Sequence, residues 1–316
     1  MERLIASIFV AVVMVLAAPA VYSQKFPNRP IRIIVSEAGS VNDLYVRLIA
    51  EGISGPLGQP VIAENRASVL FVERVANAPP DGHTMAFGAG VLYLAPVTQK
   101  VAYEPLTPVS WVSTSPYILA MHPSVPAKSV KELIDLAKAK PGVLNAGASN
   151  DPGSSSLLGV ELLKATAGVN IVRVSYKGAG PGLIGLLANE VQLYFLAPGG
   201  VMTHVRSGKL TGLAVTSLEP SPLVPGMPTL SASGLPGFEL IAVTGLMAPP
   251  KTPAPIVNQL SQEIARFLRR PETKAAFLKY EAESVGSTSE EFAAKIKSEI
   301  VKWGKVLKDA GIKVGE

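Results

Sequence analysis

The chain has 316 residues, of which 48% are hydrophobic and 17% are charged, and it contains no cysteine. This composition excludes an intrinsically disordered chain, and the length is sufficient for two hydrophobic cores. The lack of cysteine excludes disulfides, a thiol nucleophile and a lipid-modified N-terminal cysteine. The formal charge of +5 comes from scattered cations without a basic stripe or aromatic stacking positions, so we expect no nucleic-acid partner.

Residues 1–23 have the features of a secretory signal peptide. Arg3 is followed by an apolar run at residues 8–18 and by small residues before Ala20 and Ser23, the two expected cleavage positions. A membrane anchor is the alternative, but the run is short for a bilayer span and has no basic flank after it. The sequence therefore predicts a secreted protein.

We expect ligand binding at the loops that join strands to helices. Residues 30–35 are a β-branched run, residues 36–42 are small and polar, and apolar residues recur at helical spacing from Asp43 to Ile53. The N–H groups at the start of such a helix favour an anion at the carboxyl end of the strand. An ordinary strand-to-helix connection is the alternative for this stretch alone.

The same strand, loop and helix order recurs along the chain. Helices are expected at 69–78, 131–138, 157–167, 256–268 and from the capping box at Thr288 to Gly311. Strands are expected at 59–66, 84–87, 111–121, 144–147, 171–175, 191–196 and 213–216, and residues 240–247 lead into a proline-rich stretch. Small polar loops follow at 88–90, 149–156 and 176–182. Alternating strands and helices predict an α/β fold with doubly wound sheets.

The pattern divides into two units, the second inserted into the first. We expect residues 24–124 and 246–316 to form one lobe and residues 125–245 the other, with crossings near 121–128 and 243–252. Two lobes joined by two crossings predict a hinge around a cleft.

The motifs for dinucleotide binding, metal binding and serine hydrolysis are incomplete in this sequence. Residues 180–185 fit the glycine pattern of dinucleotide sites, but the expected helix after them is short and no acidic residue ends the next strand. The three histidines are isolated, which argues against a metal site. Ser154 and Ser155 lack the nucleophile-elbow pattern, so a secreted serine hydrolase is a rival interpretation with less support. We expect no catalytic residue, no metal and no cofactor.

Nine short motifs occur together in one order across the mature chain. They are RPIRIIV at 29–35, LGQPV at 57–61, ENR at 64–66, PDG at 80–82, PSVPAKSVKEL at 123–133, YKG at 176–178, GKL at 208–210, LAVT at 213–216 and EEFA at 290–293. In this set the chain resembles the Bug-type solute receptors of tripartite tricarboxylate transporters. The resemblance implies a monomeric, two-lobed periplasmic binding protein of the type II, Venus flytrap class, without cofactor. It implies capture of a small organic carboxylate in the interlobe cleft and delivery to a membrane permease. A receptor that presents its bound form to a membrane sensor is the alternative.

The chain departs from the family's pattern at the positions that are expected to contact the ligand. The first loop, 36–42, is about one residue shorter than usual, and residues 67–71 replace a glycine-rich stretch. Leu157 and Leu196 stand where the family commonly has histidine and aspartate. If these positions face the cleft, a carboxylate with an apolar or aromatic body is favoured over an amino acid or a hydroxylated tricarboxylate, with Tyr45, Phe71 or Tyr194 as possible walls.

The expected ligand-binding residues lie in loops of both lobes. Ser36, Ser40, Ser154 and Ser155 are expected to donate to carboxylate oxygens, and Lys177 to add charge. The role of Glu37, an acid in an anion-binding loop, stays open. The full expected set is Ser36, Glu37, Ala38, Gly39, Ser40, Asn42, Asp43, Ala89, Gly90, Ser149, Asn150, Gly153, Ser154, Ser155, Tyr176, Lys177, Gly178, Ala179 and Leu196.

Overall fold

The structure is a computed structural model that describes residues 26–36, 38–66, 71–94, 104–150 and 153–312. The predicted signal peptide, Glu37 and most of the replaced stretch at 67–71 lie outside the described residues. Among the described residues, none of the helices combines the length and the apolarity needed to cross a bilayer.

The first sheet has six strands in the order β11-β4-β10-β3-β1-β2. Their bounds are β11 Glu283–Ser284, β4 Thr107–Pro116, β10 Ile241–Ala248, β3 Thr84–Gly88, β1 Ile31–Val35 and β2 Val61–Asn65. The accompanying helices are α2 Val41–Leu57, α3 Phe71–Ala76, the short η1 Gly90–Leu92, α9 Ala254–Leu268, α10 Pro271–Lys279 and α11 Ser289–Asp309. β1 is parallel to both of its neighbours, as predicted from the alternating pattern.

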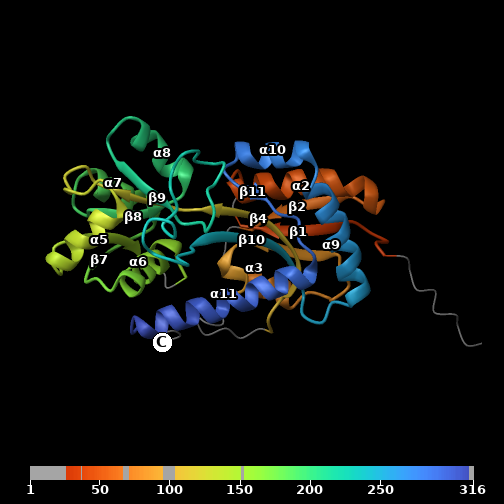
Figure 1. Ribbon diagram of the computed structural model, residues 1–316. Coiled ribbons are helices and arrows are strands. Elements are labelled where there is room, and N and C mark those ends of the chain that lie inside the picture. The colour runs from red at the N-terminus through yellow and green to blue at the C-terminus, as the bar shows by residue number, and fades with distance from the viewer. Residues whose placement is uncertain (1–25, 37, 67–70, 95–103, 151–152, 313–316) are drawn as a thin grey trace, which may run out of the picture.

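The second sheet has five strands in the order β7-β6-β8-β5-β9. Their bounds are β7 Val172–Tyr176, β6 Asn145–Ser149, β8 Leu193–Leu196, β5 Ile118–Met121 and β9 Thr211–Val215. Helices α5 Val130–Ala139, α6 Ser155–Ala167, α7 Ala179–Leu187 and α8 Pro198–Arg206 accompany it. Figure 1 shows the two sheets side by side, each flanked by helices, which confirms the predicted α/β fold.

Local sequence explains where the helices begin and end. The Ser40 hydroxyl accepts the Asp43 N–H at 3.2 Å at the start of α2, and Gly58 ends that helix with a left-handed φ of 69°. The predicted capping box at the start of α11 is confirmed, because the Thr288 and Glu291 side chains each accept the other residue's backbone N–H.

The chain changes sheet at Tyr117, between β4 and β5. The predicted strand at 111–121 is therefore confirmed as extended chain that is divided at Tyr117 between the two sheets. Pro116 gives the physical reason, since proline has no N–H with which to continue a strand ladder. The chain returns to the first sheet at Leu240, immediately before β10.

Helix α11 lies along both groups of elements (Figure 1). Its Phe292 is buried against the first sheet, while Trp303 and Leu307 belong to a hydrophobic cluster that also includes Leu158 and Leu163 of α6. The two sheets therefore share a continuous core along α11. The lobe boundaries and the hinge stay a prediction.

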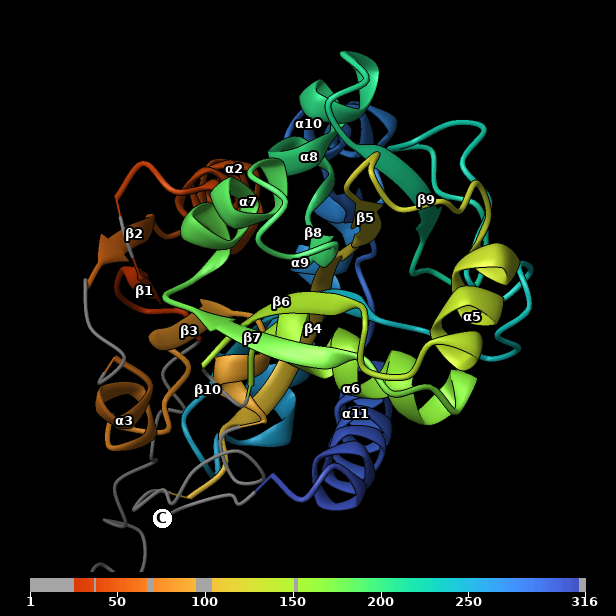
Figure 2. The ribbon, with the colours of Figure 1, turned by 90° about the vertical axis from the view of Figure 1, so that its left-hand side faces the viewer.

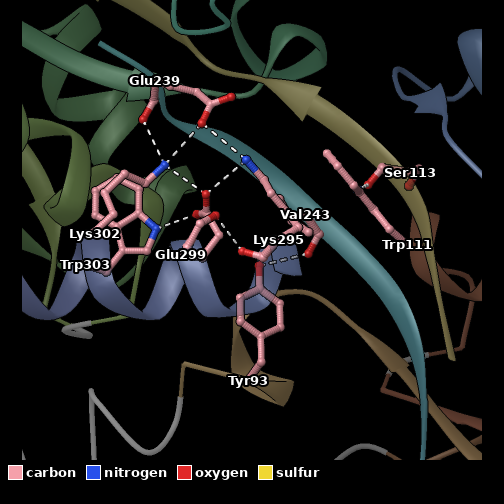
Figure 3. A network of polar contacts seen from close by, with 10 residues as sticks. Tyr93, Trp111, Ser113, Glu239, Val243, Lys295, Glu299, Lys302 and Trp303 are labelled. Atoms are coloured by element: carbon pink, nitrogen blue, oxygen red, sulfur yellow. Dashed lines mark hydrogen bonds and ion pairs between the residues drawn. The ribbon is translucent and has the colours of Figure 1, made fainter. Parts of the chain in front are cut away.

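A buried polar network fixes α11 to the segment that returns to the first sheet (Figure 3). The Glu299 carboxylate, 2% exposed, accepts from Lys302 Nζ at 2.9 Å and from Trp303 Nε1 at 2.7 Å. Lys295 Nζ lies 3.1 Å from Glu299 and 3.2 Å from Glu239, the residue before Leu240. The buried Glu299 carboxylate and the half-buried Glu239 carboxylate thus share cationic partners, as burial of a charge requires.

Candidate functional site

The carboxyl ends of the parallel strands in both sheets face the junction between them. β4 ends at Pro116 beside the second sheet, and β10 is antiparallel to both β4 and β3, so β4, β3 and β1 run in the same direction. Ile118, the first residue of β5, pairs with Leu196 at the end of β8, which is parallel to β6 as β6 is to β7. The predicted loops from the two sheets therefore face the same junction, which Figure 2 views from the side of the second sheet.

Asp43 organises the first predicted loop. Its carboxylate, 3% exposed, accepts from Gly39 N–H at 2.9 Å, from Asn65 Nδ2 at 2.9 Å and from Arg47 Nε at 3.1 Å. Burial acts to raise the pKa of Asp43, but these donors and the Arg47 charge hold it below its ordinary value. The Asp43 carboxylate is thus already hydrogen-bonded within the protein. Its role is to hold the loop in place.

The other residues of this loop remain accessible. Ala38 and Gly39 are exposed, and Ser36, Ser40 and Asn42 are half-buried. In the neighbouring loop after β3, Ala89 and Gly90 are also half-buried, and the Ala89 carbonyl accepts the Leu92 N–H at 2.9 Å in the turn of η1. Polar backbone groups of the first sheet therefore reach the junction.

Serines shape the loop between β6 and α6. The Ser156 hydroxyl accepts the Ser149 N–H at 3.0 Å, and Ser154 caps α6 by accepting the Leu157 N–H at 3.4 Å. Ser155, the first residue of α6, hydrogen-bonds the Tyr117 side chain. Asn150 is exposed, and Gly153, Ser154 and Ser155 are half-buried. The serine run therefore holds the helix start in place and leaves hydroxyls at the junction.

The loop after β7 is arranged differently from the expectation. The Tyr176 hydroxyl donates to Glu190 Oε2 at 3.1 Å, and its ring lies against Gly185, so its side chain runs along α7. Lys177 and Ala179 are exposed, and the Gly178 carbonyl accepts the Tyr194 hydroxyl at 3.3 Å. Backbone groups and Lys177, rather than the Tyr176 hydroxyl, are what this loop presents.

The apolar residues that were expected to shape the pocket are in the cores. Leu157 and Leu196 are 3% and 4% exposed, and both belong to hydrophobic clusters. Tyr45 stacks on Phe277, and Phe71 and Tyr194 are likewise buried. The three aromatic rings pack within the hydrophobic clusters, and a role as pocket walls stays a prediction.

Tyr117 was missed in the sequence, although it lies at the junction itself. Its backbone N–H donates to Thr216 Oγ1 at 2.7 Å, and its carbonyl accepts the Thr216 N–H at 3.0 Å. Burial raises the pKa of its hydroxyl, and the hydrogen bond with Ser155 acts in the opposite direction. The neighbouring Pro116 was the available signal for a break in the strand here.

Two surface cavities lie between helices. One of about 210 Å³ lies between α8 and α10 and is lined by residues of both, including Gly199, Arg206 and Leu278. The other, about 650 Å³, lies between α9 and the start of α11. Within the part of the chain that the structure describes, no cluster of His, Asp and Glu side chains could hold a metal ion.

The sequence profile described as the tripartite tricarboxylate transporter family receptor matches residues 45–312. The chain belongs to this receptor family. Among curated relatives, the protein BugT of Bordetella pertussis is 32% identical over 324 aligned positions, which cover 99% of each chain. The family assignment predicted from the nine motifs is therefore confirmed.

Solved structures agree with the family assignment. An R. palustris protein solved with adipate is 30% identical, with a TM-score of 0.73, and the match covers 90% of this receptor chain and 98% of the other. MatC from Rhodopseudomonas palustris, solved with malate, is 30% identical, with a TM-score of 0.69 and coverage of 89% and 100%. The periplasmic binding protein BugD is 29% identical, with a TM-score of 0.70 and coverage of 92% and 100%.

Proposed function

We propose that this receptor captures a small organic carboxylate in the periplasm, between its two lobes, and delivers it to a membrane permease. The observation that carries the proposal is the direction of the strands, which brings the helix starts of α2 and α6 to one junction. N–H groups at a helix start, together with the helix dipole, favour a carboxylate. Family membership and the carboxylates bound by two structural neighbours support the same class of ligand.

The ligand-binding groups are proposed to be the accessible members of the predicted set. Ser36, Ser40 and Ser155 are half-buried, the backbone of 38–39 is exposed, and Lys177 offers a cation. Asp43 and Tyr176 act by holding the loops, because their polar atoms are engaged with protein partners. This division assigns ligand contact to hydroxyls and backbone N–H groups.

We further propose that the ligand has an apolar body. Leu157 and Leu196 are packed in the cores, so these two positions supply no polar side chain to a ligand at the junction. Exposed Val41 and Val91, which follow the first two loops, add apolar surface near the same edge.

The rival hydrolase requires a histidine beside Ser154 or Ser155. Among the described side-chain contacts, His83 pairs with Asp81, and His122 pairs with Ser124. These contacts support binding without catalysis. The sensor alternative shares the same binding site and differs only in the membrane partner.

A thermal-shift panel followed by titration calorimetry tests the proposal. We expect hexanoate, adipate or an aromatic carboxylate to stabilise the purified protein, and citrate and glutamate to have much smaller effects. Serine-dependent turnover of activated esters, with no carboxylate raising the melting temperature, would refute the receptor assignment. Cross-linking of the loaded protein in native membranes, followed by identification of the partner, separates a permease from a sensor.

A further inference from the structure

A carboxylate from the first lobe lies against the start of α8 in the second. Glu281 follows α10 and precedes β11, yet a Cβ added to Gly199 of α8 would collide with its carboxylate. Glu281 and Gly199 also line the 210 Å³ cavity between α8 and α10. Both helices lie along the upper side of the molecule in Figures 1 and 2. Glu281 therefore makes a direct contact between elements of different sheets.

The start of α8 is a place that favours an anion. α8 follows β8, whose carboxyl end faces the junction, and begins with Pro198. The preceding Ala197 has no side chain that can cap the helix, so the chain's own residues at this end leave the helix dipole without a capping oxygen. The Glu281 carboxylate supplies negative charge at this position from the opposite lobe.

The backbone holds Glu281 there in an unusual conformation. Its φ is +63°, a left-handed value that costs free energy for a residue other than glycine. The Ser115 hydroxyl donates to the Glu281 carbonyl at 2.9 Å, and the Tyr45 hydroxyl donates to the preceding Tyr280 carbonyl at 2.7 Å. These bonds fix the turn from which the exposed Glu281 side chain extends.

We propose that Glu281 is a specificity-determining residue that excludes a second carboxylate of the solute from the start of α8. This inference rests on the proposed function and narrows it to a preference for monocarboxylates over dicarboxylates. Three helix starts, those of α2, α6 and α8, follow strands whose carboxyl ends face the junction. With the third occupied by the chain's own anion, a dicarboxylate places its second charge beside a like charge, which is unfavourable.

Hexanoate and adipate test the inference, because they have the same number of carbons and differ by one carboxylate. Calorimetric titration of each into the full mature chain is expected to give an affinity about tenfold higher for hexanoate. Glu281→Gln keeps the size of the side chain and removes its charge, and it is expected to raise the affinity for adipate about tenfold relative to hexanoate. Glu281→Gly, which also suits the left-handed φ, should change the ratio in the same direction.

Glu51→Gln is the matched control, since Glu51 is exposed on α2 and does not line the cavity between α8 and α10. Its ratio of hexanoate to adipate affinity should equal that of the unmodified protein. If hexanoate binds and neither Glu281 variant changes the ratio, the specificity role is overturned while the receptor function stands. If neither these acids nor any other carboxylate of the panel binds, both proposals are overturned together.

Discussion

Thr216 and Tyr117 exchange backbone and hydroxyl hydrogen bonds where the chain passes between the sheets. The Tyr117 N–H donates to Thr216 Oγ1 at 2.7 Å, and the Thr216 N–H donates to the Tyr117 carbonyl at 3.0 Å. Thr216 Oγ1 also lies 2.5 Å from the carbonyl oxygen of Leu240, on the returning segment. One fully buried hydroxyl thus joins both crossings.

Thr216→Val should destabilise the protein. It leaves the buried Tyr117 N–H and Leu240 carbonyl with one hydrogen bond fewer, and the expected loss is about 1–3 kcal/mol in the free energy of unfolding by urea. Thr114→Val is the matched control, because the Thr114 hydroxyl is buried without a partner among the described residues. That change should be neutral or slightly stabilising, and equal losses in both variants would contradict the role given to Thr216.

Glu299 should make stability depend on acid pH. Burial acts to raise its pKa, but Lys302, Lys295 and Trp303 outweigh burial and hold the pKa below the ordinary value of 4.5. A lowered native pKa means that the stabilisation is present above pH 4.5 and is lost as the pH falls further. Glu299→Gln should cost about 1–3 kcal/mol at pH 7 and flatten the acid side of the stability curve.

The pH effect of Glu299 is measured by urea unfolding at several pH values. Glu51→Gln, an exposed change on α2, should leave the curve unchanged. A Glu299→Gln curve parallel to that of the unmodified protein would show that another acid is responsible.

Asp43→Asn should loosen the first loop. An amide cannot accept all three of the hydrogen bonds from Gly39, Asn65 and Arg47, so we expect a loss of about 1–3 kcal/mol in stability and weaker carboxylate binding. Asp135→Asn breaks only an exposed ion pair with Lys131 and should change stability by less than about 0.5 kcal/mol. Unchanged stability of Asp43→Asn would disprove the organising role.

Ser154→Ala and Ser155→Ala should distinguish effects on stability from effects on carboxylate affinity. Ser154 caps α6, so its replacement should lower stability by about 1 kcal/mol and weaken binding by on the order of 1–3 kcal/mol. Ser155 follows the cap and contacts Tyr117, so its replacement should mainly weaken binding. The measurements are thermal unfolding and calorimetric titration with hexanoate. Full affinity in both variants would place the carboxylate elsewhere.

Periodicity and capping motifs were sufficient to predict most elements. Elements that depend only on neighbouring residues could be predicted from the sequence. Examples are the strand at β1, the glycine that ends α6 and the capping box of α11. Helices α8 and α10 were missed, although each begins with a proline at its first turn, Pro198 and Pro271. In α8, two glycines after the proline obscure the helical pattern.

The site was less predictable, because its geometry depends on contacts distant in sequence. Glu281 meets Gly199, and Ser155 meets Tyr117, only after the two units have assembled. The direction of Tyr176 likewise follows from its partner Glu190 rather than from its place in a loop. Loop positions could be predicted from local sequence, while side-chain directions could not.

The place of β10 in the first sheet determines the order in which this protein can fold during synthesis. β10 lies between β3 and β4, but it comes after the whole second sheet in the chain. Until residue 248 has left the ribosome, both β3 and β4 present an open edge, and such edges pair readily with other chains. The second sheet, residues 118–215, is complete earlier, so a nascent chain carries one folded unit beside one that is still open.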